Sequence, residues 1–291
     1  MTLPDSAAGR YTAIARGQPS FASGVFTLFP GVGARRARRG PCCRAKRLPI
    51  PARVRGNRPH KFRNRNGRPD SRILSFFLLA ACRGKTHDDL VDATGWAVAQ
   101  KIADPKKIAI MGGSYGGYAT LVGMTFTPEL FACGVDIVGP SNLVTFMNTL
   151  PPYWQPQVDL FVLRIGDHHT DQGREFLRER SPLTYVDKIK RPLLIGQGAN
   201  DPRVNQAESD QIVKAMQAKN IPVTYVLFPD EGHGFGRPVN NLAFNAITEA
   251  FLAGHLGGRC EPIGKDFAGS SVTVPTGAEQ VNGVREALPK Q

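Results

Sequence analysis

The chain has 291 residues, of which 41% are hydrophobic and 21% charged, so it can bury a large core. Its five cysteines are an odd number with no C-x-x-C spacing, which indicates neither a disulfide framework nor a zinc site and leaves the redox compartment open. The 37 Lys and Arg residues exceed the 24 Asp and Glu residues, and the resulting net charge of +13 first suggests a polyanion-binding protein.

The excess of positive charge is confined to one end of the chain. Residues 1–85 contain 19 Lys and Arg residues against two acidic ones, whereas residues 86–291 contain 18 against 22. The larger segment is mildly acidic and has no basic stripe with interleaved aromatic side chains, so the whole molecule is not a nucleic-acid-binding protein. We therefore expect no specific nucleic-acid partner.

Residues 1–72 show no sustained helical or strand period, and such a segment is expected to be disordered because it buries too little apolar surface. Three interpretations stay open for residues 1–85: an Arg-rich targeting peptide, a basic nucleic-acid-binding arm, or a segment not selected to fold, such as a shifted reading frame. The third is favoured, because a shifted frame in GC-rich DNA overproduces Arg, Pro, Gly and Ala. The longest apolar run, residues 73–82, is about half as long as a membrane span requires and lies too far from residue 1 for a secretory signal.

From residue 86 the sequence changes to short strands alternating with helices, which predicts a mainly parallel sheet in an α/β three-layer sandwich. We expect a folded domain over residues 86–256, and residues 257–291, rich in Gly, Pro, Ser and Thr, are predicted to form a loose or surface-wrapped tail. The expected strands are residues 108–111, 131–138, 192–197 and 223–228. The expected helices are residues 87–102, 115–125, 205–219 and 242–255.

A G-x-S-x-G motif centred on Ser114 lies where the strand at residues 108–111 meets the following helix. This context is typical of a nucleophile elbow, in which a tight turn strains the serine backbone and tolerates only small neighbours such as Gly112 and Gly116. The serine hydroxyl then projects at a helix N-terminus, and the N–H of Tyr115 is placed to donate to an oxyanion.

A serine nucleophile needs a base and an orienting acid, which in this architecture follow in the order Ser, Asp, His. Asp201 follows the strand at residues 192–197, and His233 follows the strand at residues 223–228. The loops that carry them are therefore expected at the same edge of the sheet as Ser114. We expect His233 to be the general base and Asp201 to orient it.

Other acidic and histidine residues are weaker candidates for a site. Asp230 and Glu231 are next to His233 in sequence and are expected to make local turn contacts, while Asp136 in an apolar strand is a rival orienting acid. His168 and His169 suggest a metal site, but adjacent loop residues are expected to point apart and no third ligand is evident, so we expect no metal and no cofactor.

Residues 86–270 resemble the catalytic domain of the prolyl oligopeptidase family of serine peptidases, close to its dipeptidyl aminopeptidase and acylaminoacyl-peptidase members. The resemblance implies an α/β-hydrolase fold, hydrolysis of short peptides through an acyl-enzyme, and a location either in the cytoplasm or in the periplasm. The motifs that carry it are His87-Asp88-Asp89-Leu90, Gly112-Gly113-Ser114-Tyr115-Gly116-Gly117-Tyr118, Asn200-Asp201-Pro202-Arg203-Val204 and Glu231-Gly232-His233-Gly234-Phe235.

Carried over by position, the resemblance implies that Ser114, Asp201 and His233 are catalytic and that Tyr115 supplies one oxyanion amide. Arg203 stands where some members of the family hold a substrate carbonyl, although a surface ion pair is an equal alternative. The residues in the region where the family builds its apolar pocket wall, equally compatible with plain core packing, are Leu143, Phe146, Tyr153 and Trp154.

The sequence departs from the family before residue 86. It encodes no β-propeller, none of the first hydrolase strands and no His-Gly-Pro-rich loop that would provide a second oxyanion donor. The glycines within residues 31–33 do not qualify as this loop, because no strand follows them and the surrounding sequence differs. Missing strands predict an uncovered sheet edge, and one lost oxyanion donor costs about 10²–10³-fold in rate. A carboxylesterase with the same three residues and a non-catalytic fragment with a basic arm are therefore the alternatives to a peptidase, and the oligomeric state stays open.

Overall fold

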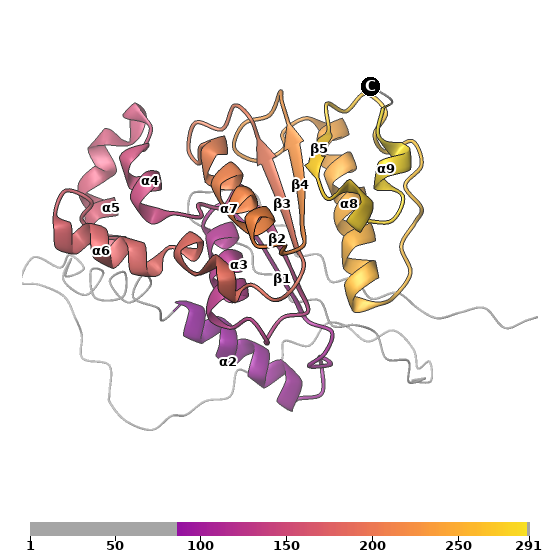
Figure 1. Cartoon of the computed structure of the whole chain (residues 1–291), viewed down its shortest axis with the longest axis horizontal. Coiled ribbons are helices and arrows are strands. Elements are labelled where there is room, and N and C mark those ends of the chain that lie inside the picture. Colours follow the sequence, from indigo (N-terminus) through magenta and orange to yellow (C-terminus); the bar gives the residue numbers. More distant parts are fainter. Residues whose placement is uncertain (1–85, 290–291) are drawn as a thin grey trace, which may run out of the picture.

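The computed structural model describes residues 86–289, which are arranged around one central sheet (Figure 1). The strands are β1 (Ala109–Gly113), β2 (Cys133–Ile137), β3 (Leu193–Gly198), β4 (Val223–Phe228) and β5 (Thr273–Thr276). The α-helices are α2 (Thr86–Ala99), α3 (Tyr115–Phe126), α4 (Leu143–Asn148), α5 (Val158–Arg164), α6 (Asp171–Arg180), α7 (Gln206–Ala218), α8 (Pro238–Leu256) and α9 (Val284–Ala287). The 3₁₀ helices are η2 (Pro152–Gln157), η3 (Pro182–Lys188) and η4 (Ala278–Gln280).

The strands follow the order β1-β2-β3-β4-β5, with the first four parallel and β5 antiparallel to β4. The predicted mainly parallel α/β sandwich is therefore confirmed. Gly113 pairs with Ile137, and Gly198 pairs with Phe228, so the carboxyl ends of β1 to β4 lie along one edge. Parallel strands bring the loops that follow them together at this edge, where α/β folds place their sites.

One face of the sheet is covered by α3, α7 and η3. Leu193 and Ile195 of β3 point to this face and belong to the buried apolar cluster beneath these helices. Leu194, between them, belongs to the buried apolar cluster on the opposite face. Successive side chains of a strand point to opposite faces, so both layers of helices need apolar strand residues, and the strands read as continuous apolar runs. Helix α3 packs so closely on β1 that a Cβ on Gly123 would lie 2.8 Å from Ile110 Cδ1.

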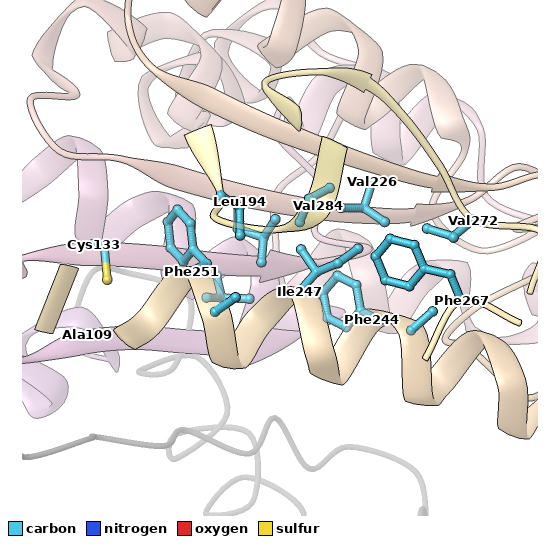
Figure 2. Close-up of a cluster of buried hydrophobic side chains, with 14 of the residues drawn as sticks. Ala109, Cys133, Leu194, Val226, Phe244, Ile247, Phe251, Phe267, Val272 and Val284 are labelled. Atoms are coloured by element: carbon cyan, nitrogen blue, oxygen red, sulfur yellow. The ribbon is translucent and has the colours of Figure 1, made fainter. Parts of the chain in front are cut away.

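The other face is covered by α8. Figure 2 shows Phe244, Ile247 and Phe251 of this helix against Leu194 and Val226 of the sheet. These five side chains are buried, and burying a side chain of this size contributes about 1.5–3 kcal/mol. Two apolar layers of helices around the sheet thus make the sandwich.

The C-terminal segment, expected as a loose or surface-wrapped tail, packs against the sheet and α8. Residues 273–276 join the edge of β4 as β5, and Val281 and Val284 are buried in the α8 cluster. Thr273 pairs with Leu227 and Thr276 with Tyr225 of β4, and Pro275 is tolerated because β5 is itself an edge strand. The boundary drawn at residue 257 stays a prediction.

The main difference from the predicted elements is in residues 139–191, where no element was expected. The structure has α4, η2, α5, α6 and η3 there. These helices are short and η2 contains Pro156, so they carry no long apolar period and depend on tertiary packing. In residues 86–289, none of the helices combines the length and apolarity needed to cross a membrane. The disorder expected for residues 1–72 lies outside the described residues.

Candidate active site

Ser114 occupies the sharp turn between β1 and α3. Its backbone has φ 58° and ψ −116°, a conformation that costs energy for a residue with a Cβ. The turn is tight because Gly112 lies directly against the backbone of Gly116, where an added Cβ would overlap. The N–H of Ser114 donates to the carbonyl oxygen of Ile137 at 2.8 Å, which ties the turn to the neighbouring strand.

Asp201 lies in the loop after β3, and both of its carboxylate oxygens accept hydrogen bonds. Oδ1 accepts the backbone N–H groups of Arg203 at 2.8 Å and Val204 at 3.0 Å. Oδ2 lies 2.7 Å from Nδ1 of His233, and the Asp201 side chain is fully buried. The loop thereby holds the carboxylate in one orientation toward the histidine.

His233 follows β4 and lies between the other two side chains. Its Nε2 is 2.9 Å from Oγ of Ser114, while Nδ1 faces Asp201. A carboxylate accepts a hydrogen bond, so Nδ1 carries the proton and Nε2 is left to accept from the Ser114 hydroxyl. The three side chains that were expected at one edge of the sheet thus form a continuous hydrogen-bonded row.

The competing carboxylates lie elsewhere. Glu231 accepts the backbone N–H groups of Gly236 at 2.9 Å and Arg237 at 2.8 Å, and Asp230 pairs with the Arg237 side chain. Both therefore make the local contacts expected of them. Asp136 is buried within β2 beneath the Ser114 turn, and its oxygens have no hydrogen bond of ordinary geometry among the described residues.

A cavity of about 300 Å³ opens beside Ser114, with a mostly apolar wall that also includes the ionisable side chains of His87, Asp88 and Arg180. Leu143, Phe146 and Trp154, predicted as wall residues, line it, whereas Tyr153 and Arg203 are not among the lining residues. Tyr153 is 55% exposed. Lining residues that the sequence reasoning missed include Val122, Phe126, Phe161, Ile165 and Val204.

The missed wall residues have a weak signal in the sequence. Phe161 and Ile165 are four positions apart, the spacing at which helical residues share a face. Helix α5 has only seven residues and Ile165 is its C-cap, so the apolar pattern spans only about two turns. In the structure Phe161 stacks on Trp154, with ring centroids 5.1 Å apart, and this contact attaches α5 to the cavity wall.

Glu208 of α7 holds the segment that begins the cavity wall. Its Oε2 accepts the backbone N–H groups of Ser141 at 3.0 Å and Asn142 at 2.9 Å, and Oε1 accepts the Thr145 hydroxyl. Burial raises the pKa of this carboxyl, and the same hydrogen bonds partly offset the increase. Since Leu143 and Phe146 follow directly, Glu208 connects α7 to the wall of the cavity.

Replacing Glu208 with alanine is expected to destabilise the protein and loosen the cavity wall. The two N–H groups would be left buried without partners, at a cost of about 1–3 kcal/mol each. We expect a lower free energy of unfolding in urea. Glu208→Gln, whose carbonyl oxygen can replace Oε2, should restore most of the stability, and equal destabilisation by the two variants would contradict this role.

The fold and the serine turn define an α/β-hydrolase: a mainly parallel sheet with a strained serine between a buried strand and a helix. The family model of the prolyl oligopeptidase family matches residues 81–259, so the chain belongs to this family of serine peptidases.

Individual relatives agree with this assignment. The chain is 70% identical to dipeptidyl aminopeptidase BIII of Pseudoxanthomonas mexicana over 205 residues, covering 70% of this chain and 30% of the relative. It is 52% identical over 180 residues to dipeptidyl peptidase family member 6 of Caenorhabditis elegans, covering 62% and 24% of the two chains. Among solved structures, a puromycin-hydrolysing peptidase of Mycobacterium tuberculosis has a TM-score of 0.55 and 32% identity, covering 61% of this chain and 27% of that one. The chain therefore spans about a quarter to a third of these proteins.

Proposed function

We propose that the chain hydrolyses peptide bonds of short peptides through an acyl-enzyme, with Ser114 as nucleophile, His233 as general base and Asp201 as the orienting acid. The observation that carries this proposal is the row of hydrogen bonds from Asp201 through His233 to Ser114, at 2.7 and 2.9 Å. The relatives named as dipeptidyl peptidases support peptides as the substrate class.

In the proposed mechanism, the Ser114 oxygen attacks the scissile carbonyl carbon while Nε2 of His233 takes the hydroxyl proton. The resulting imidazolium is stabilised by Asp201 and gives this proton to the leaving amine as the C–N bond breaks. Water then attacks the acyl-enzyme, again losing a proton to His233, which returns it to the Ser114 oxygen as the acid product leaves.

The negative oxygen of the tetrahedral intermediate needs donors. We assign one to the backbone N–H of Tyr115, the first residue of α3, where the helix dipole also favours negative charge. Arg203 stays a candidate for holding a substrate carbonyl. Its backbone N–H binds Asp201, so replacing its side chain tests substrate binding without removing that contact.

The cavity beside Ser114 supports a preference for an apolar residue on the acyl side of the cleaved bond. Its aromatic and aliphatic walls would bury such a side chain, whereas a charged one would lose hydration that the few ionisable lining residues, among them Asp88 and Arg180, replace only in part. Leu143, Phe146 and Trp154 are the wall residues that we assign to substrate binding.

A fluorophosphonate probe tests the proposal, since it phosphonylates an activated serine. We expect it to label the full chain at Ser114 and to leave Ser114→Ala unlabelled. Dipeptidyl p-nitroanilides ending in Phe or Leu should be hydrolysed faster than one ending in Lys. Labelling that survives Ser114→Ala would contradict the nucleophile assignment; turnover of p-nitrophenyl esters alone would indicate an esterase; and a folded chain with neither activity would indicate a non-catalytic fragment.

A further inference from the structure

We propose that Asp167, His168 and His169 form a binding site for a divalent transition-metal ion such as Zn²⁺. These residues lie between α5 and α6, outside the row formed by Ser114, His233 and Asp201. One potential ligand atom from each lies within 4.8 Å of the other two. Within residues 86–289, this is the only group of three or more His, Cys, Asp or Glu side chains with such a spacing.

The local backbone brings together two histidine side chains that were expected from the sequence to point apart. Residues 168 and 169 form a turn rather than an extended chain, and Oδ1 of Asp167 accepts the N–H of His169 at 2.9 Å. This bond is a side-chain-to-backbone contact of the kind that Asp makes in turns. As a result, the two imidazole rings lie side by side, with centroids 3.9 Å apart and an angle of 39° between their planes.

The loop is held in this shape by its neighbours. Nη1 of Arg174 donates to the carbonyl oxygens of His168 at 3.0 Å and His169 at 2.9 Å. Arg174 also pairs with Asp171, which compensates its positive charge beside the site. An added Cβ on Gly173 would overlap the carbonyl oxygen of Asp167, so the loop packs directly on α6. Ligands already held in place reduce the ordering cost of binding.

A second observation points to a missing ligand. Nδ1 of His168 is buried, and no hydrogen-bond partner for it exists among the described residues. A polar nitrogen withdrawn from water without a partner costs free energy. A bound cation, directly or through its coordinated water, would supply the partner that Nδ1 lacks.

The ligand set selects the class of metal. Two imidazole nitrogens and one carboxylate oxygen suit Zn²⁺, Ni²⁺ or Cu²⁺, whereas Mg²⁺ and Ca²⁺ prefer sites built from oxygen alone. Three protein ligands leave a coordination position for water. His169 is exposed, so solvent water can reach this position.

Titration calorimetry of the chelator-treated full chain with ZnCl₂ tests the site. We expect one saturable site that is weakened about tenfold or more in His169→Gln, because even outer-shell changes cost about 10–100-fold. His169 is exposed, so this variant should fold normally. Asp167→Asn, which keeps the acceptor for the His169 N–H, should also weaken binding. His255→Gln, an exposed histidine on α8, is the matched control and should leave the affinity unchanged.

X-ray absorption at the zinc edge identifies the ligands independently of any variant. Nitrogen and oxygen neighbours at about 2.0–2.2 Å with imidazole scattering would support the proposal. A sulfur shell at about 2.3 Å would assign the ion to cysteine thiolates and overturn it. Equal zinc affinity of the original chain and His169→Gln, or no saturable binding, would also overturn it.

Discussion

Replacing Asp201 with asparagine is expected to reduce kcat for peptide hydrolysis by about 10⁴-fold, the loss typical of a triad that holds the wrong histidine tautomer. The asparagine amide can donate to Nδ1 of His233, which would move the ring proton to Nε2. That nitrogen could then no longer accept the Ser114 proton. Steady-state kinetics with a dipeptidyl p-nitroanilide measure the loss.

Asp230→Asn is the matched control for this prediction. It makes the same change of charge three residues before His233, at a carboxylate that pairs with Arg237 instead. We expect its kcat to stay within a few fold of that of the unmodified chain. A small effect of Asp201→Asn, or an equal loss in the two variants, would show that Asp201 does not orient the histidine.

Replacing Asp136 with asparagine is expected to stabilise the protein at neutral pH, by an amount that grows with pH. Burial raises the pKa of this carboxyl well above its usual value of 3.8, and the nearby N–H of Gly139 offsets only part of the increase. At pH values between the usual pKa and the raised one, the Asp136 carboxyl is ionised in the unfolded chain but protonated in the folded chain. The unmodified protein therefore loses about 1.4 kcal/mol per pH unit relative to Asp136→Asn.

Urea unfolding at several pH values between 4 and 8 measures this difference. The stability advantage of Asp136→Asn should increase as the pH rises from 4 and level off once the folded carboxyl ionises. Asp159→Asn, which makes the same change on the exposed side of α5, should show no comparable slope. A pH-independent difference for Asp136→Asn would mean that the carboxyl is ionised in the folded protein.

Much of the sheet could be predicted from the sequence. The strand expected at residues 223–228 coincides with β4, and the helix expected after Ser114 begins at Tyr115 in the structure. These elements are apolar runs bounded by Gly or Pro, so local residue preference and burial favour the same structure. Helix α8 begins four residues earlier than expected, because Pro238 suits the first position of a helix.

The walls of the candidate site could be predicted only in part. Tyr153 and Trp154 are neighbours in the sequence, yet Trp154 lines the cavity and Tyr153 is exposed. The difference arises because Trp154 stacks on Phe161 of α5. A contact between two short helices leaves only a weak periodic signal in the sequence of either one.

The sequence by itself determined the α/β class and the order of Ser114, Asp201 and His233, because each follows an apolar strand whose identity depends on local composition. Only the tertiary structure decided which carboxylate faces His233, which aromatic side chains enclose the cavity, and that His168 and His169 lie together. These outcomes depend on distances between loops far apart in the chain or on the direction of one turn. Such distances and directions are set when the layers pack, so no local pattern encodes them.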